Sequence, residues 1–357
     1  LLGRRYVAGG QALAAALFDG VLRADIPVWT GTALTRLTGD EDRVTGAVVD
    51  HDGRPVTITA RRGVILAAGG FDHNMEMRHK FQSDALAADA SLGVWDNTGD
   101  AIQIAGELGA DTDLMDQAWW FPAVAPVPGR APAVMLAERS LPGSLIVNQD
   151  GKRFANECAD YMSFGQRVLE LERAGDPVES MWIVFDQSYR NSYVFAGQFF
   201  PRMALPRRWY AAGIAARADN LADLADQIGL PVREFSRTVA RFNENASVGE
   251  DPDFDRGRSA YDRYYGDPTI TPNPTPLRRG PFYAVKMVLS DLGTCGGLRT
   301  DEYARVQRTD GGTISGLYAI GNSAANTFGN TYPGAGATIA QGLVFGYVAA
   351  THAARGR

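Results

Sequence analysis

Residues 331–338 read Thr-Tyr-Pro-Gly-Ala-Gly-Ala-Thr and lead into the last apolar segment of the chain. The segment predicts a helix, and the first N–H groups of a helix have no acceptor within it, so a helix N-terminus attracts negative charge. Gly334 and Gly336 allow a ligand to approach the backbone closely, and Pro333 stiffens the turn. The stretch therefore predicts an anion-binding helix start with one phenol, that of Tyr332, beside it.

Three other stretches predict strand ends and a second helix start. Residues 316–322, GLYAIGN, indicate a short buried strand that breaks into a glycine turn. Residues 63–71, GVILAAGGF, indicate a buried strand that ends in a double glycine, for which an ordinary turn is the alternative interpretation. Residues 97–100, NTGD, are typical of a helix start, with Thr98 or Asp100 as the capping residue.

The first sixty residues carry simpler patterns. Apolar residues within 11–22 recur at helical spacing and predict an amphipathic helix. Residues 26–29 predict a strand, and residues 44–49 and 56–59 predict a hairpin around a polar turn.

Composition limits the protein class. The chain has 357 residues, is 45% apolar and contains 40 Gly and 18 Pro, which favours a loop-rich α/β enzyme with two domains. A formal charge of −6 without a basic block argues against nucleic-acid binding. Two cysteines are too few for a disulfide framework, so we expect a reducing compartment, the cytoplasm. No metal-ligand spacing occurs, and residues 337–354, interrupted by Gln341 and His352, predict a buried helix rather than a membrane span.

The strand, glycine turn, tyrosine and glycine-rich helix start together resemble the C-terminal flavin-binding block of the fumarate reductase/succinate dehydrogenase flavoprotein superfamily. Within it, TYPGAGAT resembles the 3-ketosteroid Δ1-dehydrogenases. The resemblance implies an α/β fold with a Rossmann-like FAD-binding domain, residues 1–112 and 289–357, and an inserted α+β substrate domain, residues 113–288. Residues 147–157, VNQDGKRFANE, resemble the substrate-domain hairpin of the superfamily.

The start of the chain departs from this pattern. The superfamily carries a G-x-G-x-x-G loop after an early strand, where the pyrophosphate lies on a helix end, and the 357 residues contain no such loop. We therefore expect an N-terminally incomplete FAD-binding domain and weakened FAD binding.

The resemblance also assigns residues to FAD and to catalysis. The cofactor-binding set that it implies is Ala68, Gly69, Gly70, Gly99, Asp100, Gly321, Asn322, Gly336, Ala337, Thr338 and Ile339. In catalysis, Tyr332 and the Gly336 N–H bind the C3 ketone of a steroid as an oxyanion hole does, and Tyr161 removes the proton from C2. A hydride then leaves C1 for the flavin. A phenol with a pKa near 10 is a poor base at pH 7, so Tyr161 needs a stabilising partner, which in the family is a tyrosine of the segment not found here.

Alternatives remain for each of these residues. Tyr161 and Tyr332 are also compatible with packed aromatics. Asp160 and Glu157 form a candidate acid pair, for which solvated or capping roles are the simpler interpretation. Tyr261, Tyr264 and Tyr265 are candidates for the substrate mouth or for loop packing, and Cys158 has no histidine near it in sequence.

The expected function is thus FAD-dependent 1,2-dehydrogenation of 3-ketosteroids, with an external quinone-like electron acceptor and peripheral membrane contact for an apolar substrate. One alternative is a flavin enzyme that acts on another enone or a dicarboxylate. Residues 158–166 lack the arginine that fumarate reductases place after the Asn-Glu pair, which argues against a fumarate reductase. The other alternative is a non-catalytic fragment without stable FAD.

Overall fold

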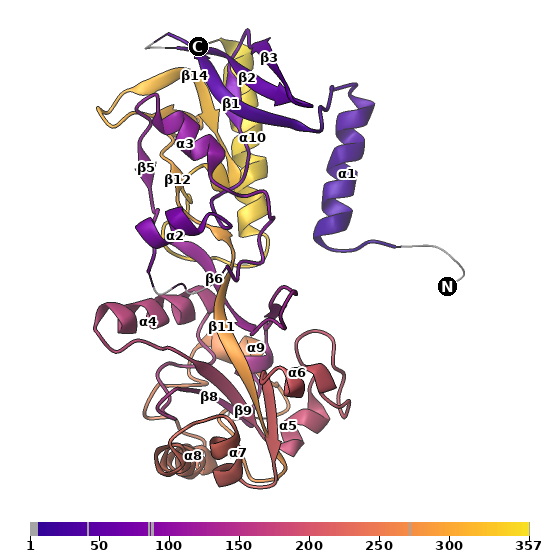
Figure 1. Ribbon diagram of the computed structural model, residues 1–357, viewed down its shortest axis with the longest axis vertical. Helices are drawn as coiled ribbons and strands as arrows, with labels where there is room; N and C mark the ends of the chain where they lie inside the picture. The colour runs from indigo at the N-terminus through magenta and orange to yellow at the C-terminus, as the bar shows by residue number, and fades with distance from the viewer. Residues whose placement is uncertain (1–5, 41–42, 85, 87–88, 271–272, 357) are drawn as a thin grey trace.

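The computed structural model describes residues 6–40, 43–84, 86, 89–270 and 273–356. It is a mixed α/β structure, as expected, and it is elongated (Figure 1). A terminal part, residues 32–113 and 297–355, lies at one end and a middle part, residues 133–277, at the other. Two strands, β6 (Ala118–Val124) and β11 (Phe282–Thr294), connect them.

The terminal part contains three small sheets. The first is the antiparallel sheet β1 (Thr32–Gly39), β2 (Val44–His51) and β3 (Arg54–Thr59), so the predicted hairpin is confirmed. The second has the order β13 (Arg305–Gln307), β14 (Thr313–Ala319), β4 (Val64–Leu66), and the third pairs β5 (Thr112–Asp113) with β12 (Gly297–Leu298). Strands β14 and β4 run parallel, so the GLYAIGN and VILAAGG strands end at the same edge.

Helices α2 (Met75–Phe81), α3 (Asp100–Gly106) and α10 (Ala337–Arg355) and the short helix η2 (Gly321–Ser323) complete this part. The predicted last helix is confirmed, but the expectation that it is buried is wrong. Leu343, Val344 and Tyr347 are 45%, 57% and 76% exposed, because no described element covers this face of α10. One side of the helix packs against Tyr318 and Ile320 instead.

Helix α1 (Gly10–Arg23) lies to one side of the terminal part (Figure 1). None of its residues is buried, although its apolar residues recur at helical spacing. The strand predicted at residues 26–29 is wrong, since these residues are coil that leads from α1 to β1. A short apolar run that finds no partner strand gains no ladder hydrogen bonds and does not form a strand.

The middle part is built on a six-stranded sheet with the order β7 (Ala133–Val134), β6, β11, β9 (Met181–Phe185), β8 (Ser144–Asn148), to which β10 (Ala215–Ala218) adds by pairing with β11. Helices cover its faces: η1 (Glu138–Ser140), α4 (Tyr161–Arg173), α5 (Gln187–Ser192), α6 (Arg207–Ala211), α7 (Leu221–Gln227), α8 (Val232–Ser247) and α9 (Ala260–Tyr265). One hydrophobic cluster contains Phe164, Ile183 and Trp209, and another, under α7 and α8, contains Trp182 and Phe242.

The hairpin expected at residues 147–157 is not formed. Strand β8 pairs with β9, and residues after it turn back so that the Asn148 N–H donates to the Lys152 carbonyl at 2.9 Å. Alternating strand patterns do not show which strand becomes the partner, since the choice depends on contacts distant in sequence.

A third cluster lies where the two parts meet. It is formed by Trp119 and Trp120 of β6, Met162 of α4 and Cys295 at the end of β11, with Tyr332 packed against it. Tyr332, in the TYPGAGAT segment, therefore lies at the junction between the terminal and middle parts.

Candidate active site

Tyr161 and Tyr332 come together at this junction, although 171 positions separate them in the sequence. Tyr161 is the first residue of α4, and Tyr332 lies in the loop before α10. Their ring centroids are 4.9 Å apart. The Trp119 ring lies 5.2 Å from Tyr332 and the Phe121 ring 4.8 Å from Tyr161, both from β6. The two phenols assigned to catalysis are thus neighbours in an aromatic cluster.

The start of α4 is fixed by the acidic residues before it. Asp160 is the N-cap, and its carboxylate accepts from the Ser163 N–H at 2.9 Å, the capping role considered from the sequence. Glu157 is neither solvated nor a cap, because it is fully buried and accepts from Arg153 Nε and Nη2, each at 2.7 Å. Neither carboxylate points to a catalytic acid pair. Both hold the turn from which Tyr161 emerges.

Burial raises the pKa of Tyr161 well above its usual 10, and the neighbouring hydroxyls of Tyr332 and Tyr261 raise it further. Burial also raises the pKa of Tyr332, while the hydrogen bond with Tyr161 lowers it. This bond favours the protonated form of Tyr161 and the ionised form of Tyr332, the reverse of the expected roles, in which Tyr332 stays protonated and Tyr161 acts as the base.

A further pair of phenols faces these two. Tyr261 and Tyr265 lie on α9 with ring centroids 4.9 Å apart, and both raise the pKa of Tyr161. Tyr264 is 80% exposed and points elsewhere. Of the three tyrosines considered for the substrate mouth, two therefore border the candidate site.

Gly336 caps α10 and has a φ of 94°, a left-handed conformation that favours glycine. The Ala337 N–H donates to the Gly334 carbonyl at 3.2 Å, and the Ala340 N–H to the Gly336 carbonyl at 2.8 Å. Within the described residues, the N–H groups of Thr338 and Ile339 have no acceptor. This is the donor set that the sequence predicted for an anionic group.

The turns after β4 and β14 are tied to each other by Ser323. Its hydroxyl accepts from the Ala68 N–H and donates to the Gly69 carbonyl, both at 2.9 Å. Gly69 has a φ of 79°, and a Cβ there would lie 2.0 Å from Asn97 Oδ1. Gly321 has a φ of 58°, a left-handed conformation that favours glycine, and it lies against Gly342 of α10. The implied cofactor residues Ala68 to Gly70 and Gly321 to Asn322 therefore form one edge.

The expected cap of α3 is wrong in detail. Gly99 is the N-cap with a φ of 81°, and no side chain accepts from the first turn. The Thr98 hydroxyl instead donates to the Asp100 carboxylate at 3.1 Å. A Cβ on Gly99 would lie 2.7 Å from Met77 Sδ, so close packing requires glycine here.

A buried acidic network next to this edge was missed in the sequence. The Asp72 carboxylate accepts from the Thr294 N–H at 2.8 Å and from Asn97 Nδ2 at 2.6 Å. Asp291 pairs with Arg78 at 2.6 Å. Burial raises the pKa of Asp72, and the charge of Asp291 raises it further. The only sequence signal was the Asp that follows the double glycine and Phe71, and its partner Thr294 is 222 residues away.

The residues present fit the flavin half of FAD. Free N–H groups at the start of α10 and the paired glycine turns provide donors and close backbone approach where two parallel strands end, the usual place for a dinucleotide. Gly336, Thr338 and Ile339 would face the anionic edge of a flavin ring, and Ala68 to Gly70 with Asn322 the chain attached to it.

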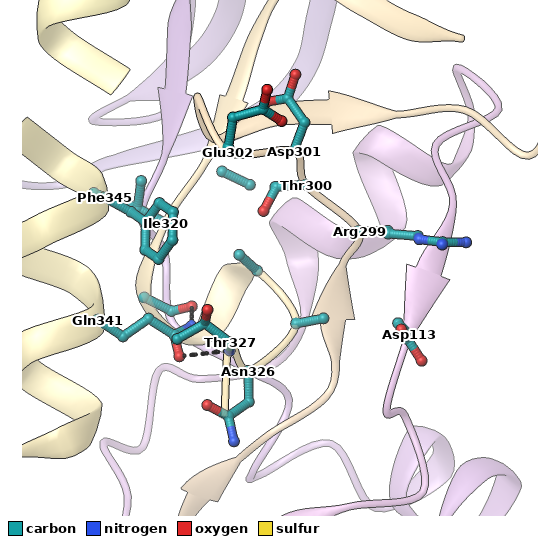
Figure 2. Close-up of a pocket in the computed structure, with 14 residues that line it drawn as sticks. Asp113, Arg299, Thr300, Asp301, Glu302, Ile320, Asn326, Thr327, Gln341 and Phe345 are labelled. Carbon is teal, nitrogen blue, oxygen red and sulfur yellow. Dashed lines mark hydrogen bonds between the residues drawn. The ribbon is translucent and has the colours of Figure 1, made fainter. Parts of the chain in front are cut away.

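A cavity of about 370 Å³ is lined by the Ile320–Gly321 turn and by residues of α10 (Figure 2). Gln341 of α10 spans it, donating to the Gly321 carbonyl and accepting from the Thr327 N–H, each at 3.1 Å. Its charged lining residues are Asp113, Arg299, Asp301 and Glu302. Arg299 is paired with Asp111 at 3.3 Å, so the cavity is net acidic and unsuited to a pyrophosphate. It includes neither Tyr161 nor Tyr332.

Two features are absent from the part of the chain that the structure describes. No three His, Cys, Asp or Glu side chains come together there in an arrangement that would hold a metal ion. None of its helices combines the length and the apolar character that a bilayer crossing requires.

Comparison with known proteins gives a family and several relatives. The family model described as FAD binding domain matches residues 2–339. A 3-oxosteroid 1-dehydrogenase of Mycobacterium tuberculosis is 47% identical, covering 99% of this chain and 64% of its own. A 4-oxocyclohexanecarboxylate 2-dehydrogenase of Sinomonas cyclohexanicum is 37% identical over 96% of this chain and 60% of its own.

The fold comparison agrees. The crystal structure of the 3-ketosteroid Δ1-dehydrogenase of Sterolibacterium denitrificans, in complex with 1,4-androstadiene-3,17-dione, superposes with a TM-score of 0.91 at 39% identity, covering 98% of this chain and 63% of that one. The chain thus spans somewhat less than two thirds of the length of these relatives. Both the expected fold class and the resemblance are confirmed, and the chain belongs to the FAD binding domain family.

Proposed function

We propose that this protein works with FAD as a 3-ketosteroid 1,2-dehydrogenase. The observation that carries the proposal is the contact between Tyr161 and Tyr332, with ring centroids 4.9 Å apart beside the α10 start. Two phenols next to free N–H donors suit a reaction in which a ketone oxygen gains charge while a neighbouring carbon loses a proton. The names of the relatives support the same substrate class.

In this proposal, Tyr332 and the Gly336 N–H donate to the C3 ketone oxygen and stabilise the negative charge that develops on it. The C2 hydrogens become acidic, and Tyr161 accepts one of them as a proton. FAD, when bound, supplies the acceptor for the hydride that leaves C1. An external quinone-like acceptor then takes the electrons from the reduced flavin. Cys158 and Cys295 are free and buried, which is consistent with a reducing compartment.

A second candidate has the same chemistry on a smaller ring ketone. The relative from Sinomonas cyclohexanicum is named for a cyclohexanone carboxylate. The aromatic wall of Trp119, Phe121 and Tyr332 favours an apolar steroid ring over a carboxylate. Parallel assays with a 3-keto-4-ene steroid and with 4-oxocyclohexanecarboxylate decide between the two substrates.

The test of the roles uses protein in which bound FAD is verified by its visible absorbance. Loss of one oxyanion donor costs about 10²–10³-fold in rate, so we expect Tyr332→Phe to slow turnover by that factor. We expect Tyr161→Phe to abolish both turnover and hydrogen exchange at steroid C2 in heavy water. Tyr210→Phe, at a partly buried tyrosine of α6, is the matched control. Undiminished exchange in Tyr161→Phe would remove this residue from the mechanism.

A further inference from the structure

Arg139, in η1, is a buried cation without an acidic partner. Its side chain is only 1% exposed, and it forms no ion pair with a described carboxylate. Nη1 donates to the carbonyl oxygens of Glu157, at 2.5 Å, and Ala159, while Nε and Nη2 have no partner among the described residues. Burial lowers the pKa of Arg139, but a guanidinium stays protonated in proteins. A full positive charge therefore lies inside the middle part, 5.7 Å from the centre of the Phe164 ring and without an ion-pair partner among the described residues.

A network of buried hydrogen bonds holds three segments around this charge. Asn273 Nδ2 donates to the Ser140 carbonyl, next to Arg139, at 2.9 Å and to the Asp262 carbonyl of α9 at 3.5 Å. Asn156 Nδ2, in the turn before Tyr161, donates to Asp262 Oδ2 at 3.1 Å. Because Asp262 follows Tyr261 in α9, these bonds fix η1, the start of α4 and α9 relative to one another.

The phenols of the site lie within the field of Arg139. Burial raises the pKa of Tyr261, and the charge of Arg139 opposes this as the largest lowering influence. The charges of Tyr261 and Tyr161 in turn raise the pKa of Arg139, against the effect of burial. The other titratable groups that face them are Tyr265, Tyr332, Asp160 and Cys158, none of which carries positive charge.

We propose that Arg139 is a positioning residue for Tyr161: its unpaired guanidinium stabilises negative charge on the phenols of Tyr161 and Tyr261 and so favours the basic form that proton abstraction needs. The inference rests on the proposed function, in which Tyr161 accepts the C2 proton. Tyr161 first releases its own proton to solvent, which leaves a phenolate beside the cation. The C2 proton then restores the neutral phenol, so that charge is balanced at each step.

The hydrogen bonds of Arg139 to the carbonyls of Glu157 and Ala159 allow a second interpretation, in which it only holds the turn before α4. Arg190 provides a matched comparison. It is also buried, at 2% exposure, donates to the carbonyls of Tyr193 and Phe200, and has an unpartnered Nε. It faces other phenols, those of Tyr189, Tyr210 and Tyr283.

The experiment places 3,5-difluorotyrosine, close in size to tyrosine and more acidic, at position 161 or at position 261 of the FAD-free chain. The ¹⁹F chemical shift reports ionisation as pH is varied. The variants are Arg139→Gln, which keeps donors for the carbonyls without charge, Arg139→Lys, which keeps the charge, and Arg190→Gln as control. Circular dichroism verifies folding, and Arg139→Met replaces Arg139→Gln if the latter is unfolded.

Removal of an opposite charge shifts a pKa by about 1–3 units, so we expect Arg139→Gln to raise the pKa at both positions, by more at 261 than at 161. We expect Arg139→Lys to retain most of the original value and Arg190→Gln to change neither. The proposal would be overturned if the pKa at position 161 and the pKa at position 261 each had the same value in Arg139→Gln as in Arg190→Gln. The titration uses no steroid and no flavin, so an inactive enzyme would refute the proposed function and leave this result standing.

Discussion

Arg153 holds two buried carboxylates, and replacing it with methionine tests how the turn before Tyr161 is stabilised. Arg153 binds Glu157 through Nε and Nη2 at 2.7 Å, and Asp251 through Nη1 and Nη2 at 2.7 and 2.8 Å. Glu157 is fully buried and Asp251 is 7% exposed. Arg256 remains 3.5 Å from Glu157, so the variant would leave two carboxylates for one cation.

Loss of one partner from a buried ion pair costs about 3–5 kcal/mol, because the remaining charge is uncompensated. Arg256 keeps part of the compensation, so we expect a loss of about 3 kcal/mol in the free energy of unfolding. Urea denaturation, followed by tryptophan fluorescence, measures it. The matched control is Arg241→Met, whose partner Asp253 lies in the same loop as Asp251 but whose side chain is exposed. An exposed pair contributes little, so the control should unfold as the wild type does.

The pH dependence gives an independent measure of the same interaction. Burial alone would raise the pKa of Glu157, but Arg153 and Arg256 outweigh it and hold this pKa below its usual 4.5. A lowered pKa in the folded state contributes stability above the unfolded value, and this stability is lost as pH falls through the folded value. The difference between wild type and Arg153→Met should therefore shrink as pH falls below the usual value of 4.5 and through the lower folded value. Equal losses in Arg153→Met and Arg241→Met, or a difference independent of pH, would refute the reasoning.

Three smaller perturbations test other features. Asp160→Ala removes the cap of α4, and thermal unfolding should show a loss of about 1 kcal/mol; no loss would mean that water replaces the cap. Gly69→Ala places a Cβ 2.0 Å from Asn97 Oδ1 at a φ of 79°, so FAD titration should show weaker binding than in the wild type. Burial lowers the pKa of His73 but its 2.7 Å bond to Asp89 raises it overall, so Asp89→Asn should lower this pKa in an NMR titration. Any stability from this raised pKa is present below the unfolded value of 6.5 and lost as pH rises through the folded value.

Local patterns in the sequence predicted the elements that carry their own signals. The helix predicted over 337–354 followed from its apolar stretch, and the hairpin at 44–59 from strand alternation around a polar turn. The family resemblance assigned the GLYAIGN and VILAAGG strands to one domain and singled out the two tyrosines, but the parallel pairing of β4 with β14 was not predicted. Whether the proposed residue roles and the boundaries at 112 and 288 hold stays a prediction.

The rest depends on contacts between distant positions. Asp72 meets Thr294 across 222 residues, and Arg139 lies against carbonyls that follow it by about 20. No local pattern around Arg139 indicates burial, because arginine is usually exposed. The sequence therefore indicated that Tyr161 needs a stabilising partner, but no local pattern pointed to Arg139 as a candidate.

The chain passes between the terminal and middle parts twice, and both passages are strands of one sheet. In β6 and β11 the pairing runs from Ala118–Thr294 to Val124–Met287, and α4 packs on β6. Two hydrogen-bonded strands resist rotation about their long axis more than they resist bending perpendicular to the plane that they form. The irregular pairing between Asp291 and Thr294, with Gly293 at a φ of 123°, interrupts the ladder and bends this ribbon locally. A swing of the middle part would then open and close the gap between Tyr161, carried by one part, and Tyr332, carried by the other, in a single direction.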